Sequence, residues 1–297
     1  MNAHPDFPDR APVPACPICA GHATPWLIKS AYRLVRCAFC GHGYLANPLP
    51  RDHVARQYDD DYFFGGGDGY ADYTASGDLL RAQGRYHASL IARHAPPGRM
   101  IDIGAAAGFV LKGFEDAGWQ GIGIEPNATM RVYGRKMLDV NLISGDAESF
   151  SAGDPVDLVT MIQVIGHLHD LHAALRNLSF ALKPGGLCLV DYWDRTSLPA
   201  RMLGAGWHEI SPPSVVHWFG PDDLAAAFAR HGLHQLDSGR PRKIVLGRHV
   251  ASLLHHKLSE SRLLAPIAGL TKLIPPGLRI PYPPLDLKWA LFRKEAA

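Results

Sequence analysis

The sequence lacks long apolar runs and carries almost no net charge. None of its uninterrupted apolar stretches reaches the about 18 residues that a membrane-spanning helix requires, so we expect no transmembrane helix. Residues 1–14 are polar and rich in proline. Because they contain no apolar core of a signal peptide, we expect a cytoplasmic protein. The 30 basic and 28 acidic residues are interspersed and leave a net charge of +2, which gives no signature of a nucleic-acid-binding or membrane-binding surface.

Cysteine is also scarce, and four of the five cysteines form two C-x-x-C pairs separated by seventeen residues. These residues are Cys16, Cys19, Cys37 and Cys40. Two such pairs can present four thiolates to a tetrahedral, structural Zn²⁺ ion, and the metal would stabilise a segment too short to fold on its own core. A disulfide framework or a redox pair is the weaker interpretation in a cytosolic chain. Cys188 lies in a later apolar run, which predicts a core thiol.

The dinucleotide-binding fingerprint G-x-G-x-x-G is absent from the place where it would be expected. An apolar strand at residues 100–103 leads into Gly104, but Ala106 and Phe109 occupy the two other glycine positions. Helical periodicity begins at Phe109, and a second strand at residues 122–124 ends in Glu125. The pattern predicts a βαβ unit whose small-residue turn lets a ligand approach the backbone. An acid at the tip of the second strand can accept both hydroxyls of a ribose.

Further strands follow at regular intervals. We expect the third strand at residues 140–143, the fourth at 157–163 and the fifth at 187–192. A Lys-Pro-Gly-Gly turn at residues 183–186 ends the helix before the fifth strand, because proline cannot continue a helix and glycine permits a sharp turn. The last two strands are predicted at residues 233–236 and 243–246.

The spacing Asp102-x-Gly104-x-Ala106-x-Gly108 resembles the first motif of class I S-adenosylmethionine-dependent methyltransferases. Glu125, the acid after the third strand and the Leu-Lys-Pro-Gly-Gly turn occur in the order of that family. The resemblance implies an α/β fold with a Rossmann-like, doubly wound, mostly parallel seven-stranded sheet whose last strand is antiparallel, together with a small N-terminal zinc ribbon. The ribbon, an aromatic segment at residues 58–64 and the first motif together resemble a group of bacterial small-molecule and sugar methyltransferases. In that group the aromatic segment often forms a lid near the cofactor, although these aromatics can equally be core residues.

The resemblance implies a set of residues that bind S-adenosylmethionine at the carboxyl ends of the strands. They are Asp102, Gly104, Ala105, Ala106, Gly108, Glu125, Pro126, Asp146, Ala147, Gln163 and Val164. The fourth-strand tip departs from the family, which commonly has Val-Leu-Glu-His-x-x-Asp there, because Gly166 replaces the glutamate before His167. This replacement puts in doubt any role that the family assigns to that carboxylate.

Two histidines are candidate general bases, since a neutral imidazole titrates near the working pH. His167 lies at the fourth-strand tip, where it can instead brace the following helix. His217 lies in an insertion at residues 194–220 that is rich in Trp, His and Pro, and that resembles the family's stretch above the acceptor side. A structural role, with its ring bonded to a carbonyl, is open for His217 as well.

The chain is therefore predicted to consist of four segments. Residues 1–46 form the zinc ribbon, 47–98 a helical linker or lid, 99–250 the S-adenosylmethionine-binding domain, and 251–297 a helical, proline-rich extension. The extension is basic and partly amphipathic, so it either packs on its own domain or touches a membrane surface or a partner helix.

We expect an enzyme that transfers a methyl group from S-adenosylmethionine to a small molecule: a sugar, a nucleotide-sugar, or a natural-product hydroxyl or carbon. The alternatives are an rRNA or tRNA methyltransferase that grips RNA with its ribbon, and a non-catalytic binding protein that keeps the fold. The near-neutral charge argues against a nucleic-acid partner. The sequence does not indicate the oligomeric state.

Overall fold

The structure, a computed structural model, describes residues 12–47, 49–50, 52–65, 72–151, 153–260 and 265–296. Its largest element is a seven-stranded sheet in which only one strand runs antiparallel to the others, in the order β10-β13-β8-β7-β4-β5-β6. The strands are β4 (Arg99–Ile103), β5 (Gln120–Ile124), β6 (Leu142–Ile143), β7 (Val156–Ile162), β8 (Leu182–Trp193), β10 (Leu233–Gly239) and β13 (Leu287–Lys294). The predicted α/β fold class is confirmed.

The antiparallel strand of the sheet is not the one that the sequence predicted. Residues 243–246 form β11 (Lys243–Leu246), which pairs with β12 (Arg279–Tyr282) in a separate two-stranded sheet. The antiparallel place between β8 and β10 belongs to β13, from the predicted C-terminal extension. The physical reason is burial: an inner strand must be apolar on both faces, and Ile244 of β11 is 45% exposed whereas residues 289–292 of β13 are buried.

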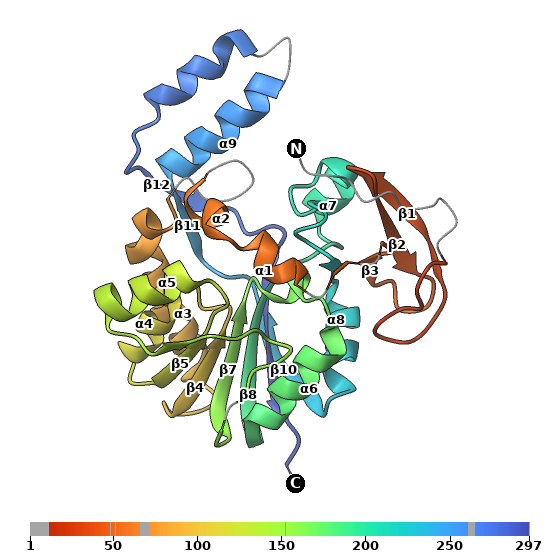
Figure 1. The fold of residues 1–297 in the computed structure, drawn as a ribbon, viewed down its shortest axis with the longest axis vertical. Helices are drawn as coiled ribbons and strands as arrows, with labels where there is room; N and C mark the ends of the chain where they lie inside the picture. The colour runs from red at the N-terminus through yellow and green to blue at the C-terminus, as the bar shows by residue number, and fades with distance from the viewer. Residues whose placement is uncertain are drawn as a thin grey trace.

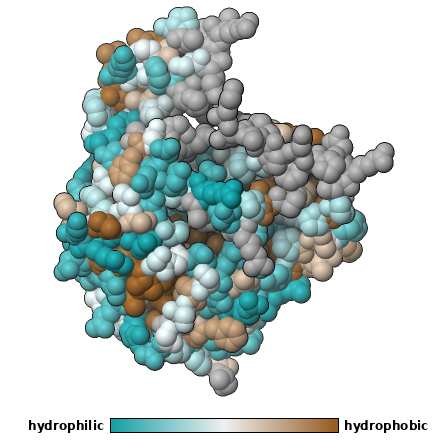
Figure 2. All heavy atoms as spheres, viewed as in Figure 1, coloured by the Kyte–Doolittle hydropathy of each residue, from teal (hydrophilic) through white to brown (hydrophobic). Residues whose placement is uncertain are grey.

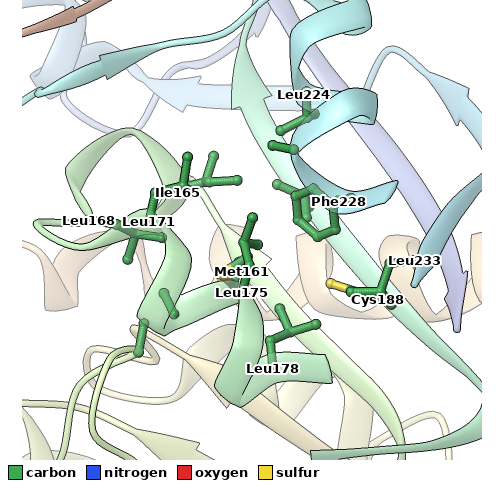
Figure 3. Packing of buried hydrophobic residues seen from close by; sticks show 14 of the residues in the cluster. Met161, Ile165, Leu168, Leu171, Leu175, Leu178, Cys188, Leu224, Phe228 and Leu233 are labelled. Carbon is green, nitrogen blue, oxygen red and sulfur yellow. The ribbon is translucent and has the colours of Figure 1, made fainter. Parts of the chain in front are cut away.

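Helices cover both faces of the sheet (Figure 1). On one side lie α3 (Gly77–Ile91), α4 (Phe109–Glu115) and α5 (Ala128–Tyr133), and on the other lie α6 (Leu171–Ala181) and α8 (Pro221–Ala229). Figure 3 shows the second side, where Leu175, Leu178 and Phe228 pack onto Met161 and Cys188 of the central strands. Successive strand residues point to opposite faces, so the side chains of a continuous apolar run such as β7 pack against the helices on both sides of the sheet.

The fifth strand begins earlier than predicted. Leu182 already pairs with Val156, and Leu187 pairs with Leu158, so the register shifts between these two pairs. The Lys-Pro-Gly-Gly residues 183–186 therefore form a bulge within the bounds of β8 instead of a turn that precedes the strand. A bulge accommodates extra residues without breaking the pairing on either side, and Gly185 supplies a φ of +76° there.

The predicted ribbon packs against the methyltransferase-like sheet domain and shares a strand with it. Its strands β1 (Ala23–Lys29), β2 (Tyr32–Cys37) and β3 (Gly43–Leu45) form a sheet that β9 (His217–Trp218) completes from the insertion. Ile18 and Tyr44 of the ribbon lie in the same buried cluster as Leu224 of α8. Residues 1–11 of the predicted ribbon segment lie outside the described residues. The ribbon and the insertion are thus one structural unit.

Three segments surround the carboxyl ends of the parallel strands. The short helices α1 (His53–Gln57) and α2 (Asp60–Phe64) lie across these ends, and the insertion with α7 (Leu198–Leu203) lies beside them (Figure 1). Residues 66–71 of the predicted lid lie outside the described residues. An arm formed by α9 (Gly247–Glu260) and η5 (Ala265–Leu273) projects from the sheet domain.

The surface of the projecting arm is mixed in character. Figure 2 shows hydrophobic and hydrophilic spheres side by side on it, and Leu270 and Leu273 are 60% and 78% exposed. Among the helices of the described residues, none is both long and apolar enough to cross a membrane.

Candidate functional site

The loop after β4 has the backbone conformation that its small residues permit. Gly104, Ala106 and Gly108 have φ values of +71°, +48° and +83°, in the left-handed region where side chains are costly. A Cβ atom on Gly104 would lie 2.5 Å from Cγ2 of Val164. The first motif and the tip of β7 therefore meet at Gly104, which has room only for hydrogen.

Glu125 joins this loop to the tip of β5. One carboxylate oxygen accepts a hydrogen bond from the backbone N–H of Ala106 and the other from that of Asn127, both at 2.8 Å. Burial raises the pKa of Glu125, while the two backbone donors and the guanidinium of Arg131 oppose this shift. Each carboxylate oxygen can accept more than one hydrogen bond, so the geometry is compatible with the predicted binding of ribose hydroxyls.

Asp102 lies below the loop, on β4. Its Oδ1 accepts a hydrogen bond of 2.6 Å from the hydroxyl of Thr160 on β7. Burial raises the pKa of Asp102 to about 7; the Thr160 hydrogen bond opposes this shift and the charge of Glu125 adds to it. Two neighbouring buried acids favour a cationic ligand, and S-adenosylmethionine carries positive charge on its sulfonium and its ammonium groups.

The remaining predicted cofactor residues surround the same strand tips. Oδ1 of the exposed Asp146 accepts hydrogen bonds from the backbone of Glu148 and Ser149, at 2.9 and 2.8 Å, and so organises the turn after β6. Ala147 is buried in that turn. Gln163 has a φ of +59° and donates its N–H to Asp191 O at 2.9 Å.

The predicted lid contacts the cofactor loop directly. Nδ2 of Asn127 donates to Asp60 Oδ1 at 3.0 Å, and the Thr129 hydroxyl donates to Asp60 Oδ2 at 2.9 Å. Phe63 packs in one buried cluster with Ala106 and Phe109. An open pocket of about 470 Å³ remains between residues 58–61 of this segment and residues 126–128. Residues 58–64 therefore cover the tips of β4 and β5, and they also contribute to the core.

His167 lies where the lid, the tip of β7 and the insertion meet. Its Nδ1 is 2.8 Å from the carbonyl oxygen of Ser214, and the ring of Tyr58 stands edge-on to it at 5.3 Å. A carbonyl only accepts, so Nδ1 carries the hydrogen and Nε2 carries the lone pair. Burial lowers the pKa of His167, which keeps the imidazole neutral at pH 7. The arrangement suits a proton acceptor.

His217 has a different environment, inside the contact between ribbon and sheet domain. Its Nδ1 is 3.1 Å from Nε2 of His42, and Nδ1 of His42 is 3.0 Å from a carboxylate oxygen of Asp223. All three side chains are buried, and His217 is only 8% exposed. Burial, followed by the neighbouring His42, lowers the pKa of His217 well below its usual value. The structure places the His217 ring within a buried polar chain that does not include His167.

The four ribbon cysteines converge on one point. Their sulfur atoms all lie within 4.8 Å of one another, with separations of 3.3 Å for Cys19–Cys37 and 3.6 Å for both Cys16–Cys40 and Cys19–Cys40. Four thiolates at about 2.3 Å around a tetrahedral zinc ion would lie about 3.8 Å apart. The backbone N–H groups of Ile18 and Phe39 point at the sulfurs, at 3.4 Å. The donor set and geometry fit zinc.

An aromatic cluster borders the other side of the β7 tip. Trp193, at the end of β8, contacts the ring of His208 at 4.5 Å and the ring of Tyr282 at 5.9 Å, both edge-on. Trp207 and Tyr282 donate hydrogen bonds to the buried carboxylate of Asp286, at 2.8 and 3.1 Å. The insertion and the two-stranded β11–β12 sheet thus form one wall together, at the edge where an acceptor would lie.

The structure brings the predicted cofactor residues together around Gly104 and Glu125, and it separates the two candidate bases. Sequence reasoning missed Thr160, Asn127 and the Asp223 chain. Asn127 carries a usable signal, because an asparagine directly before a helix is a preferred N-cap, and its side chain accepts from Met130 N at 2.8 Å. The bond from Gly220 N to Asp223 Oδ1, 2.7 Å, follows a local capping pattern at the start of α8, but nothing local in the sequence predicts the contact of Asp223 with His42.

Comparison with known proteins agrees with this geometry. Residues 78–237, more than half of the chain, match a family described as a methyltransferase domain. Similar curated proteins include two ubiquinone biosynthesis O-methyltransferases of Rhodopseudomonas palustris. That of strain BisB18 is 34% identical over 201 residues, which cover 65% of each chain. That of strain BisA53 is 36% identical over 114 residues, which cover 36% of this chain and 45% of the relative. The chain thus spans about half to two thirds of the length of these relatives.

Among solved structures, the fold is similar to a chain from the complex between the Haloferax volcanii Trm112 methyltransferase activator and a methyltransferase. The TM-score is 0.53 at 16% identity, over 76% of this chain and 95% of that chain. At this identity the similarity concerns the fold alone. The family match, together with the loop after β4 and the acid at the tip of β5, establishes that the chain belongs to the methyltransferase-domain family and has the class I S-adenosylmethionine-dependent fold.

Proposed function

We propose that this protein transfers a methyl group from S-adenosylmethionine to a hydroxyl group of a small molecule, and that a zinc ion held by the four cysteines stabilises the ribbon. The observation that carries the proposal is the anchored carboxylate of Glu125, which two backbone N–H groups hold beside the left-handed loop after β4. The relatives named as O-methyltransferases support oxygen as the methylated atom.

The residues around the β4 loop would bind and orient the cofactor. S-adenosylmethionine supplies an electrophilic methyl group on a sulfonium, which is already a good leaving group. The protein therefore acts mainly by alignment and by exclusion of water. Asp102 and Glu125 supply negative charge and hydrogen-bond acceptors, and Gly104 lets the ligand approach the backbone. Asp146, in the turn after β6, would accept a hydrogen bond from the adenine of the cofactor. Residues 58–64 cover this site.

On the acceptor side, His167 is better placed than His217 to take the hydroxyl proton. The carbonyl of Ser214 fixes the tautomer in which Nε2 of His167 accepts a proton. The Nδ1 atom of His217 is engaged with His42 in a buried chain. We therefore infer that His167 holds the proton released when the oxygen–carbon bond forms, while His217 fixes the insertion on the ribbon.

Calorimetric titration of S-adenosylmethionine and S-adenosylhomocysteine tests the cofactor site. We expect micromolar affinity in the wild type and a loss of about 100-fold in Glu125→Ala, since a charged hydrogen-bond acceptor for two hydroxyls contributes about 3 kcal/mol. Glu115→Ala is the matched control, because this acid lies at the opposite end of the same strands, beside Trp119 and Gln120. Absence of S-adenosylmethionine binding in a folded, zinc-containing protein would contradict the proposed methyl transfer and favour a non-catalytic binding protein.

Turnover with labelled S-adenosylmethionine tests whether His167 is the general base. We expect His167→Ala to lower kcat by about 100-fold, which is typical of a lost general base, and His217→Ala to act mainly through stability. Unchanged turnover in both variants would remove histidine as the base.

A further inference from the structure

The space beside Gly166 is occupied by a carboxylate from another segment. Gly166 lies in the 3-10 turn η3 (Ile165–His167) at the tip of β7. A Cβ atom placed on it would have three neighbours: the carbonyl oxygen of His217 at 3.3 Å, Cγ1 of Val215 at 3.6 Å, and Oε1 of Glu209 at 3.8 Å. A glutamate at position 166 would extend its side chain by about this distance. Glu209 thus brings its carboxylate to the side of the turn on which a side chain at position 166 would extend.

The backbone around Glu209 is firmly held. Its carbonyl oxygen accepts a hydrogen bond of 2.8 Å from the indole N–H of Trp218. On either side, Trp207 and Ile210 are fully buried, and the N–H of Ile210 bonds to the carbonyl of Trp207 at 2.9 Å. The side chain of Glu209 itself is only partly buried. The fold therefore fixes the backbone from which this carboxylate extends.

Glu209 also lies close to the aromatic wall. Burial and the neighbouring Asp286 raise the pKa of Tyr282, and the charge of Glu209 contributes to the same shift. Tyr282 in turn contacts Trp193 at the end of β8. The Glu209 carboxylate, contributed by the insertion, is therefore situated between Tyr282 of the aromatic wall and Gly166, which precedes His167 in the tip turn of β7.

We propose that Glu209 is the specificity-determining carboxylate of the acceptor pocket, where it accepts a hydrogen bond from a donor group of the acceptor other than the hydroxyl that is methylated. The proposal rests on the proposed methyl transfer. The reacting hydroxyl then faces Nε2 of His167, which takes its proton, and Glu209 holds the rest of the molecule in register. A pocket built to accept a hydrogen bond rejects analogues that lack the donor.

The chain offers a direct test, because the carboxylate can be moved back to position 166. The φ of Gly166 lies outside the left-handed region, and a Cβ atom there would lie 3.3 Å from the carbonyl oxygen of His217, so a side chain requires this oxygen to shift by a few tenths of an ångström. Glu209→Gln keeps the size of the side chain and removes the charge. Gly166→Glu in the Glu209→Gln background restores a carboxylate from the other side of the same space, and Glu209→Asp retains the charge in place.

The experiment measures steady-state kinetics with labelled S-adenosylmethionine on a panel of phenols, dihydroxybenzoates and hexoses, and cofactor affinity by calorimetry on the same samples. We expect Glu209→Gln to raise the acceptor KM and to lower kcat/KM by about 30-fold, with cofactor affinity within about twofold of wild type. The double variant should recover kcat/KM to within about fivefold of the wild type. Glu209→Asp should retain more activity than Glu209→Gln.

Each other outcome overturns the proposal in a recognisable way. A kcat/KM of Glu209→Gln within about twofold of wild type would remove Glu209 from the acceptor pocket. A loss that neither Gly166→Glu nor Glu209→Asp reverses, accompanied by a lower Tm, would assign Glu209 a structural role. If the wild type bound the cofactor but methylated no member of the panel, the proposed methyl transfer to such hydroxyls would fail first, and the role of Glu209 would fail with it.

Discussion

The two halves of the carboxyl edge of the sheet are built in different ways. The cofactor half, around β4, β5 and β6, comes mainly from one stretch of chain, and the hydrogen bond between Ala106 and Glu125 spans only 19 positions. Two longer contacts add Thr160 of β7 and Asp60 of the covering segment. The acceptor half, around β7 and β8, is assembled from distant segments. The ribbon, the insertion and the β11–β12 pair all contribute, and β9 completes the ribbon sheet.

This difference has a chemical reason. A cofactor-binding loop can be built from one local turn, whereas a pocket specific for one acceptor is built from loops that are added to the fold. The comparison implies that the two halves can be damaged separately. Four variants or treatments test how far that separation goes.

The largest effect is expected from loss of the zinc site. Cys37→Ser, or removal of metal by a chelator, should lower methyl-transfer turnover by about 100-fold or more, because metal binding supplies folding free energy of the ribbon and β3 holds β9 of the insertion. Cofactor affinity should change by less than about threefold, since few cofactor contacts come from the ribbon. Elemental analysis, turnover and calorimetry measure the three quantities.

Cys188→Ala is the matched control for this treatment, because Cys188 is a buried thiol of β8 outside the cluster. It should keep full metal content. If Cys37→Ser abolished cofactor binding as strongly as turnover, the two halves would form one cooperative unit and could not be damaged separately.

The next largest effect is expected in the cofactor half, from Gly104→Ala. The added methyl meets both a left-handed φ of +71° and Val164 Cγ2 at 2.5 Å, so we expect about 2 to 4 kcal/mol of destabilisation and a loss of cofactor affinity of at least about 30-fold. Gly185→Ala is the matched control, since Gly185 has a φ of +76° with open space around it. That variant should lose only about 1 kcal/mol of the free energy of unfolding.

Denaturant unfolding and calorimetry separate the effect of the left-handed φ of Gly104 from the effect of the close contact with Val164. Val164→Ala in the Gly104→Ala background should recover about 1 kcal/mol or more, because it removes the contacting methyl groups. If Gly104→Ala and Gly185→Ala were equally unstable, the close approach of the β7 tip to the first motif would be irrelevant.

These residues also show how far the sequence alone leads. The strands and the loop of the cofactor half were predictable, because its small-residue turn, its strand-ending acid and its apolar runs are local patterns, whereas the assignment of its residues to the cofactor stays a prediction. The acceptor half was not. The pairing of β3 with β9, the Asp223–His42–His217 chain and the approach of Glu209 to Gly166 join residues that lie far apart in sequence, and no local pattern encodes such contacts.

The seventh strand was misplaced for the same reason. Residues 243–246 and 287–294 are both apolar enough to be strands, and only their competition for one place in the sheet decides between them. β13 occupies that place because its Leu287, Ala290 and Phe292 fill the core, whereas β11 pairs with β12. The division of the chain into four segments stays a prediction, but the sheet takes its antiparallel strand from beyond residue 250.

The third effect concerns pH. In the free protein burial raises the pKa of Asp102 to about 7, so near pH 6 this carboxyl is mostly protonated. A cationic ligand favours the ionised form, so binding releases a proton, and affinity for S-adenosylmethionine should rise about tenfold between pH 6 and pH 8. Asp102→Asn should flatten this dependence. Calorimetry in buffers of different ionisation enthalpy measures the proton release directly.

The same group acts with the opposite sign on the stability of the free protein. Because its folded-state pKa lies above the ordinary value, Asp102 contributes stability at low pH that is lost as the pH rises through about 7. A pH-independent cofactor affinity in the wild type would show that Asp102 does not sense the cationic ligand.

The smallest effect is expected at the outer end of the cofactor half, where Asp146 is exposed. Asp146→Asn keeps an oxygen that can accept from the backbone of Glu148 and Ser149, and so preserves the turn, but it replaces the second carboxylate oxygen with a donor. We expect a loss of cofactor affinity of about three- to fivefold, because an exposed hydrogen bond contributes less than about 1 kcal/mol. Asp170→Asn is the matched control, since Asp170 is an exposed N-cap of α6 that accepts from Ala173 N at 2.9 Å. Equal cofactor affinities of the two variants would limit the cofactor half to β4 and β5. A loss of affinity above about 30-fold would instead mean that residues 58–64 cover the adenine and exclude water from this end of the site.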